Sequence, residues 1–224
     1  MSQQDEVVHF ILSNPFTMLI AGPTKSGKTT FVDNLIKNSL NEECSLFTLK
    51  PTFFFYFYNQ ERPKQEGLHK NIHEFIEGLP TMEWLAETKK EYGDNITVII
   101  DDQALNINKD TAELFSVGSS RQECNVILLT QNLFGKKKEN RDISLNSTYI
   151  ILFKNPRDKL SVQSFFRQID PQNQKKLIDI YLDATKKAYS YVFVDLFAET
   201  DEDNRLLSNI YCENGDDPIL YRYN

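Results

Sequence analysis

Six short apolar runs constrain the fold of this chain more than any other feature of its sequence. Each run is rich in β-branched or aromatic residues and lacks a clean alternation of polar and apolar positions. Strands that are buried on both faces of a largely parallel sheet have this pattern. The runs are Phe16 to Ala21, Thr52 to Tyr58, Ile96 to Ile100, Val126 to Thr130, Tyr149 to Phe153 and Tyr189 to Val194.

Stretches with helical spacing of apolar residues lie between these runs. They are Lys28 to Ser39, Asp110 to Ser116, Ser161 to Gln168 and Gln172 to Lys187, and Asp170-Pro171 separates the last two. Alternating strands and helices predict an α/β fold with a mostly parallel central sheet and helices on both faces. The sequence shows no repeat, low-complexity tract or Pro/Gly-rich linker, so we expect residues 1–224 to form a single domain.

Composition indicates the compartment and limits the partners. No apolar run approaches the ~20 residues that span a bilayer, and the acidic, polar N-terminus is not a signal peptide. Three cysteines (Cys44, Cys124 and Cys212) lie far apart, which predicts buried free thiols rather than a disulfide framework. We therefore expect an intracellular, reducing setting and no membrane partner.

The net charge of −7 restricts any contact with nucleic acid to local surfaces. Proteins that neutralise many phosphates usually present a basic face. The candidates are the run Lys136 to Lys138 and the pairs Lys175-Lys176 and Lys186-Lys187. A run of charges is more often an ordinary solvated loop or helix face, and that is the alternative for each of them.

The segment Gly22 to Thr29 matches G-x-x-x-x-G-K-[ST], with a buried strand predicted before it and an amphipathic helix after it. Glycines at both ends let successive backbone N–H groups point at a phosphate, and the start of the helix adds its positive end. We expect Lys28 to reach the β- and γ-phosphates of ATP and the Thr29 hydroxyl to bind Mg²⁺. The predicted nucleotide contacts are Gly22, Pro23, Thr24, Lys25, Ser26, Gly27, Lys28, Thr29 and Thr30.

Two adjacent carboxylates, Asp101 and Asp102, follow the run Ile96 to Ile100 directly. Charges at the end of a buried strand are costly unless they serve a cation or a reaction. We expect Asp101 to support the magnesium ion and Asp102 to act as the base that activates the attacking water. The base is commonly a glutamate in such enzymes, so Asp102 is one methylene shorter.

A third strand is predicted to end at Thr130, immediately before Gln131. Parallel strands deliver their carboxyl ends to one edge of the sheet, where ligands bind. We therefore expect Gln131 to lie beside Asp101 and to orient the attacking water or sense the γ-phosphate. The alternative is that Gln131 is simply a polar residue that ends a strand.

Taken together, these segments resemble the FtsK–HerA group of DNA-pumping ATPases. More narrowly, they are similar to the genome-packaging ATPases of Maverick/Polinton elements and adintoviruses, which are related to the poxvirus packaging ATPase. The resemblance covers roughly residues 10 to 224. Its motifs are Gly22 to Val32, Glu77 to Thr81, Ile99 to Asp102, Thr130 to Phe134 and Ile151 to Asp158.

The resemblance implies a RecA-like P-loop NTPase core, a homo-oligomeric ring, and ATP with Mg²⁺. It also implies that the chain moves double-stranded DNA into a capsid, with capsid proteins as partners, at a virion-assembly site inside a host cell. Members of the group place a catalytic arginine before the strand that carries the sensor residue, and Arg121 holds that place here. Arg157 and Arg167 are the alternatives.

Two other functions share parts of this pattern. A small-molecule or nucleotide kinase also uses a phosphate loop and a parallel sheet, but no arginine-rich lid is visible in the sequence. A nucleotide-binding assembly scaffold without turnover would not need the set of Asp101, Asp102 and Gln131. The sequence therefore favours an ATPase.

Overall fold

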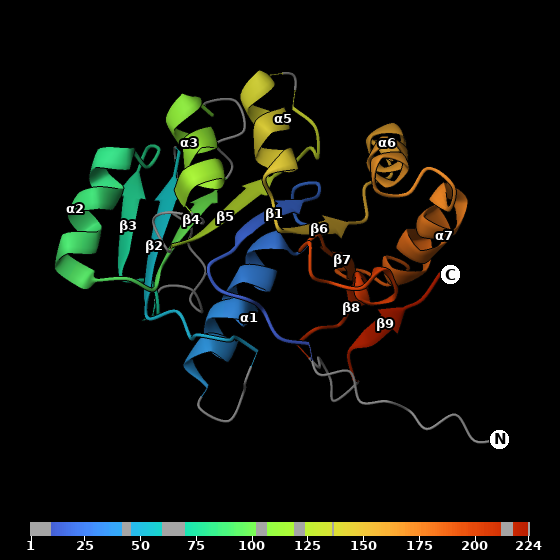
Figure 1. Cartoon of the computed structure of the whole chain (residues 1–224), viewed down its shortest axis with the longest axis horizontal. Coiled ribbons are helices and arrows are strands. Elements are labelled where there is room, and N and C mark those ends of the chain that lie inside the picture. Colours follow the sequence, from blue (N-terminus) through green and yellow to red (C-terminus); the bar gives the residue numbers. More distant parts are fainter. Residues whose placement is uncertain are drawn as a thin grey trace.

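The computed structural model describes residues 10–41, 46–59, 70–101, 107–118, 124–135, 137–211 and 217–223. Within these residues one nine-stranded sheet runs through the molecule in the order β3-β2-β4-β5-β1-β6-β7-β8-β9 (Figure 1). The strands are β1 Thr17–Ala21, β2 Phe53–Tyr58, β3 Glu74–Glu77, β4 Ile96–Asp101, β5 Asn125–Thr130, β6 Tyr149–Phe153, β7 Tyr191–Asp195, β8 Leu206–Ser208 and β9 Ile219–Tyr221. The helices are α1 Lys28–Leu40, α2 Met82–Tyr92, α3 Lys109–Glu113, α5 Lys138–Leu145, α6 Lys159–Ile169 and α7 Gln174–Ala184, with a π-helical turn at Leu114–Gly118 and a 3₁₀ turn at Glu202–Asn204.

The direction of the strands divides the sheet into two parts. The six strands from β3 to β6 are parallel, whereas β7, β8 and β9 each run antiparallel to the strand before them. The predicted α/β fold with a mostly parallel sheet is therefore confirmed. The carboxyl ends of β4, β5, β1 and β6 consequently lie along one edge of the sheet.

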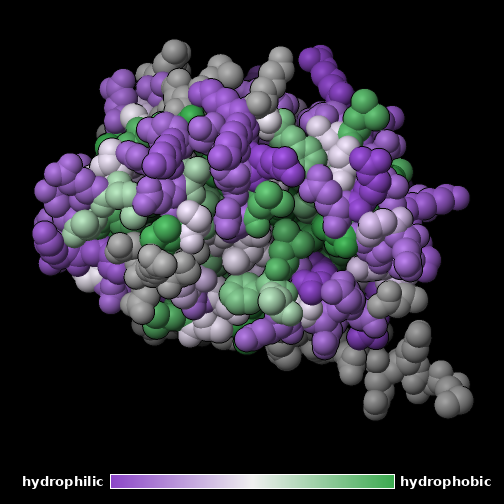
Figure 2. Space-filling view, turned by 45° about the horizontal axis from the view of Figure 1, so that its top comes forward, coloured by the Kyte–Doolittle hydropathy of each residue, from purple (hydrophilic) through white to green (hydrophobic). Residues whose placement is uncertain are grey.

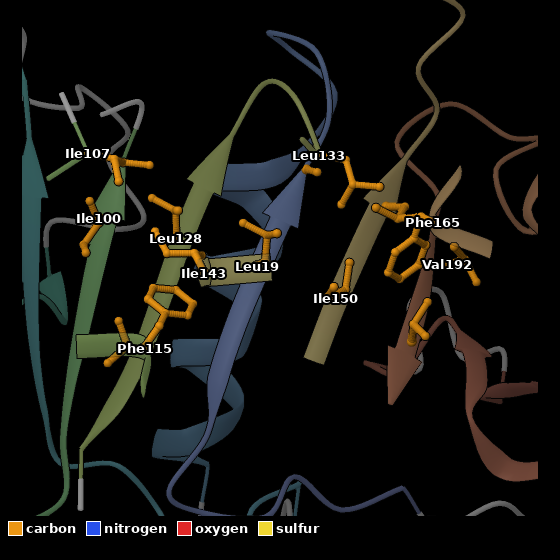
Figure 3. Packing of buried hydrophobic residues seen from close by; sticks show 14 of the residues in the cluster. Leu19, Ile100, Ile107, Phe115, Leu128, Leu133, Ile143, Ile150, Phe165 and Val192 are labelled. Atoms are coloured by element: carbon orange, nitrogen blue, oxygen red, sulfur yellow. The ribbon is translucent and has the colours of Figure 1, made fainter. Parts of the chain in front are cut away.

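Helices cover both faces of the sheet, as predicted, and each face has its own apolar core. On one face Phe31, Leu35 and Ile36 of α1 pack with apolar side chains of β1, β5 and β6. On the other face α2, the α3 region, α5, α6 and α7 cover a second cluster (Figure 3). Every described residue of β1, β5, β6 and β7 is buried, which explains why these runs show no alternation.

The predicted elements agree with the structure to within a few residues, with one informative difference. The run that begins at Tyr189 becomes a strand only at Tyr191, because Tyr189 adopts a left-handed backbone conformation with φ of 66°. Asp170 separates α6 from α7 as predicted, and its carboxylate accepts hydrogen bonds from the backbone N–H groups of Gln172 and Asn173. The Asn173 side-chain amide donates a further bond at 2.8 Å, and this bond, followed by the backbone bonds, holds the pKa of Asp170 below its usual value.

The surface is mostly hydrophilic on the face that Figure 2 shows, with a hydrophobic area near its centre. Among the described helices, none is long and apolar enough to cross a membrane. Cys124 is a buried free thiol, as predicted, and burial raises its pKa to about 12. Cys44 and Cys212 lie outside the described residues.

Candidate nucleotide-binding site

The loop between β1 and α1 is shaped by its two glycines. A Cβ atom on Gly22 would lie 2.7 Å from Phe153 Cβ and 2.8 Å from Ser26 Oγ, so no larger residue fits there. Gly27 has a φ of 109°, and a Cβ atom there would lie 3.2 Å from Phe153 Cε1. Both glycines thus allow the loop to curl against the end of β6.

Gly27 leads directly into α1, whose first turn carries neither a side-chain cap nor an acidic residue. By contrast, Thr81 caps α2 and Asp158 caps α6, each through a hydrogen bond to a backbone N–H group. The first N–H groups of a helix without a cap are available to an anion, which the helix dipole also favours. The start of α1 is therefore suited to bind phosphate.

Lys28 and Ser26 supply the polar side chains of the loop. The Lys28 ammonium donates hydrogen bonds to the carbonyl oxygens of Gly22 at 2.8 Å and Pro23 at 3.1 Å. Ser26 Oγ is buried and has no hydrogen-bond partner among the described residues. A buried hydroxyl without a partner is costly, and a phosphate oxygen would satisfy it. The residues of the loop therefore fit a bound nucleotide.

The structure brings Gln131 close to this loop. The backbone N–H of Gly22 donates to the carbonyl oxygen of Thr130 at 3.1 Å, and Gln131 is the next residue. Gln131 and Gly22 line one small cavity of about 10 Å³, together with Asn155 and Asp158 from the β6–α6 connection. This volume corresponds to roughly one water molecule.

Asp101 ends β4 at the same edge of the sheet, one strand further from β1. It pairs with Leu129 of β5, two residues before Gln131. The Tyr56 hydroxyl donates a 2.5 Å hydrogen bond to Asp101 Oδ2. A short bond to an ionised acceptor is among the stronger hydrogen bonds in proteins, so Tyr56 fixes the direction of this carboxylate.

Several predicted residues cannot be placed. Asp102, Arg121 and Lys136 lie outside the described residues. The two alternative arginines, Arg157 and Arg167, are exposed, and Arg157 belongs to the same β6–α6 connection as Asn155. Because Asn155 lines the cavity beside Gly22, this connection borders the phosphate loop.

The described residues offer few protein ligands for magnesium. Among the described residues, no group of three or more His, Cys, Asp or Glu side chains could hold a metal ion. Mg²⁺ is commonly held by one or two protein oxygens together with water and substrate phosphates. Thr29 in the first turn of α1 and Asp101 at the end of β4 are consistent with such a site.

Sequence reasoning missed two aromatic residues that shape the site, Phe153 and Tyr56. Phe153 packs against the positions of both loop glycines. Tyr56 is paired with Ile99 of β4, so its side chain shares a face with Asp101, two residues further on. The register of β2 against β4 is the signal that reveals this pair, and it follows only from the three-dimensional pairing.

Comparisons with known proteins give the chain no family. No family model and no curated protein matches it. Two matching solved structures are the cytoplasmic domain of EssC (14% identity, TM-score 0.43) and Thermomonospora curvata EccC (ATPases 2 and 3) in complex with a signal sequence peptide (10% identity, TM-score 0.37). These matches cover 65% and 64% of this chain, which spans about a third of the matched chains (33% and 30%).

Proposed function

We propose that this chain is an ATP-hydrolysing motor subunit of the FtsK–HerA type that translocates double-stranded DNA. The observation that carries the proposal is the phosphate loop at the end of the central strand β1, with Gln131 in the same cavity as Gly22. A loop that only bound phosphate would not need a polar side chain at the end of the next strand. We further propose that it packages a viral or virus-like genome into a capsid inside a host cell, which the sequence motifs alone support.

In this proposal each residue has a distinct role. Backbone N–H groups between Thr24 and Thr30 and the Lys28 ammonium bind the phosphates of ATP. Thr29 and Asp101 would hold Mg²⁺, which would supply positive charge to the phosphates of ATP. Gln131 orients the attacking water, and Asp102 accepts its proton.

The experiment that tests the function is measurement of phosphate release with and without duplex DNA. We expect the wild-type protein to release phosphate from ATP in the presence of Mg²⁺ and to do so faster with DNA. The Lys28→Ala variant should lose on the order of 10²–10³-fold in turnover, because it lacks a cation facing the reacting phosphate. Phosphate transfer to a small acceptor would instead identify a kinase, and nucleotide binding without turnover would identify a scaffold.

If the subunits form a ring, we expect an arginine of one subunit to contact the ATP bound to its neighbour. An arginine that meets the developing charge on the γ-phosphate contributes about 10³–10⁵ in rate in P-loop enzymes. If Arg121 acts in this way, Arg121→Ala should bind ATP but hydrolyse it poorly. Mixing it with Lys28→Ala should restore part of the activity, because Arg121 of the second protein then serves the intact loop of the first. Turnover that does not depend on protein concentration, without recovery on mixing, would contradict this arrangement.

The contact with DNA is assigned to the run Lys136 to Lys138, which follows β5. Lys137 and Lys138 are exposed at the start of α5, and the Lys137 ammonium donates to the carbonyl oxygen of Ile107 at 3.3 Å. Neutralising all three lysines should weaken DNA binding and flatten its dependence on salt, because fewer counterions are released. An unchanged salt dependence would assign the run to an ordinary solvated surface.

A further inference from the structure

A groove of about 560 Å³ lies on the β7–β9 side of the sheet. Its walls are the end of α7, the turn before β7, and the strands β8 and β9. The side-chain amide of Asn209 donates to the carbonyl oxygen of Asp217 at 3.2 Å, which ties the end of β8 to the segment that leads into β9. The volume falls within the ~300–1,000 Å³ that is typical of small-molecule sites.

Tyr189 stands out among the residues of this groove. Its side chain is 72% exposed, and its backbone has a φ of 66°. A bulky residue in the left-handed region is uncommon and carries strain, which persists where the surrounding structure requires it. The Ser190 hydroxyl donates to the carbonyl oxygen of Lys187 at 2.7 Å and so closes the turn that carries Tyr189.

The groove comes nearest to the phosphate loop at Tyr189, which lines it. A Cβ atom on Gly27 would lie 3.5 Å from Tyr189 Cβ and 3.7 Å from Tyr189 Cδ1. Gly27 directly precedes α1, whose first N–H groups face the phosphates in the proposed function. An exposed aromatic ring therefore lies within van der Waals reach of the point where the phosphates of a nucleotide would end.

The opposite flank of the loop carries the residues that the proposed function places at the metal and the γ-phosphate. Asp101 and Gln131 lie on the β4–β5 side of β1, where the proposed function places the metal and the γ-phosphate. The other end of the nucleotide must then leave the loop toward β6 and β7. That end consists of a flat, uncharged base and a ribose, whose chemistry suits an aromatic ring and the short polar side chains of Ser208 and Asn209.

We propose that this groove binds the base and ribose of the nucleotide, with the base stacked on Tyr189. The proposal rests on the proposed function, because it extends the site that holds the phosphates. A stacked aromatic ring recognises the flat face of a base and tolerates its identity. In this proposal the groove that contains Tyr189 contributes affinity for the nucleoside and takes no part in hydrolysis.

The test compares two probes, ATP and inorganic tripolyphosphate, each titrated with Mg²⁺ into the wild-type protein and three variants by calorimetry. We expect wild-type protein to bind ATP more tightly than tripolyphosphate. In Tyr189→Ala the Kd for ATP should rise by roughly 5- to 100-fold, the range expected for loss of one stacked base. The Kd for tripolyphosphate should stay unchanged, which also shows that the variant is folded.

Two further variants act as controls. Tyr189→Phe keeps the ring and should bind ATP like the wild-type protein. Leu182→Ala removes another exposed side chain (55%) from α7 without touching the groove, and it should change neither Kd.

Three outcomes separate the two proposals. Wild-type affinity for ATP in Tyr189→Ala would overturn the stacking assignment and leave the phosphate site intact. An equal loss of ATP and tripolyphosphate binding in that variant would also overturn it, because Tyr189 would then only support the loop at Gly27. A wild-type protein that binds neither probe would contradict the proposed function itself.

Discussion

The two sides of β1 differ in the chemistry that they bring to the phosphate loop. On the β5–β4 side β4 ends in Asp101, and Gln131 directly follows the end of β5. On the β6–β7 side the loop packs against aromatic rings, since Phe153 contacts both glycine positions and Tyr189 contacts Gly27. One side therefore presents a carboxylate and an amide to the loop, and the other presents aromatic rings.

The direction of the strands explains this division. Parallel strands must end at the same edge, so their last residues can cooperate with the loop after β1. β7 runs antiparallel to β6 and begins, rather than ends, at that edge. Its last residue, Asp195, consequently lies at the far edge, away from the phosphate loop.

Among the variants that test this comparison, Gly27→Ala on the aromatic side has the largest expected effect. An added Cβ atom meets Phe153 at 3.2 Å, so the loop or the ring must move. Displacing two N–H groups that each bond to a charged phosphate should weaken ATP binding by about 10²–10⁴-fold, since each such bond is worth about 1.5–3 kcal/mol. The Kd for ATP, measured by calorimetry, gives the result.

A matched control separates this contact from backbone strain. Gly78 has nearly the same φ, 108°, but a Cβ atom there would meet nothing within 4 Å. Gly78→Ala should therefore lose only the ~1–2 kcal/mol of a left-handed alanine and keep its affinity for ATP. Replacing Phe153 by Leu in the Gly27→Ala protein should recover part of the binding. Equal losses of ATP affinity in the two glycine variants would show that Phe153 does not shape the loop.

The next effect tests the polar side through Tyr56→Phe. This change removes the hydroxyl that donates to Asp101 Oδ2 and leaves the ring in place. Residues that orient a metal ligand typically contribute 10–100-fold to metal affinity or activity. We expect the Mg²⁺ concentration for half-maximal ATPase rate to rise by about that factor. Tyr58→Phe, at the end of the same strand, is the control, and an equal response of both variants would refute an orienting role for Tyr56.

The sequence and the structure agree best where local pattern decides the outcome. Fully buried runs predicted β1, β5 and β6, and the motif from Gly22 to Thr29 predicted the turn between β1 and α1. Short or polar elements were missed: β3 has four residues, and α5 consists largely of charged and polar ones. These elements are set by tertiary packing rather than by their own periodicity.

The site itself was only half visible in the sequence. Lys28, Asp101 and Gln131 are polar residues at the ends of predicted strands or loops, so their type and position predict a binding site. Phe153 and Tyr56 look like ordinary core residues in apolar runs, and only the pairing of strands brings them to the loop and to Asp101. Tyr189 was predicted to begin a strand, although it precedes one.

A smaller effect, on stability, is expected from Tyr191→Phe within the aromatic side. The Tyr191 hydroxyl accepts a hydrogen bond at 3.1 Å from the buried backbone N–H of Ile210. Loss of the acceptor leaves that N–H without its partner and should lower the free energy of unfolding by about 1–3 kcal/mol. The ring contact with Phe31, at 4.9 Å between centroids, remains. Urea denaturation measures the change. The control is Tyr221→Phe, which removes a hydroxyl that donates to the exposed Asp183 at 3.2 Å and should lower the free energy of unfolding by less. A larger loss in Tyr221→Phe would contradict this ranking.

The smallest expected effect concerns Asp195, the carboxylate at the edge opposite Asp101. Its oxygens accept hydrogen bonds from the Phe197 N–H at 2.9 Å and the Thr200 hydroxyl at 3.0 Å. Burial nevertheless raises the pKa of Asp195 above its usual value of 3.8. The folded protein therefore binds this proton more tightly than the unfolded chain does. Its contribution to stability is greatest below the unfolded pKa and declines as pH rises through the interval up to the folded pKa.

Asp195→Asn carries no ionisable proton and should lose this decline. The free energy of unfolding of the variant minus that of the wild-type protein should be larger at pH 7 than at pH 4, so the variant is relatively more stable at pH 7. The difference should be less than the ~1 kcal/mol of an average point mutation. Urea denaturation of both proteins across that interval isolates the difference, because the other carboxylates titrate equally in each. ATP hydrolysis at pH 7 should not change, since Asp195 lies at the edge away from the phosphate loop. A loss of hydrolysis in this folded variant would mean that the two edges of the sheet are coupled, and that the division between a reactive and a structural side of β1 is incomplete.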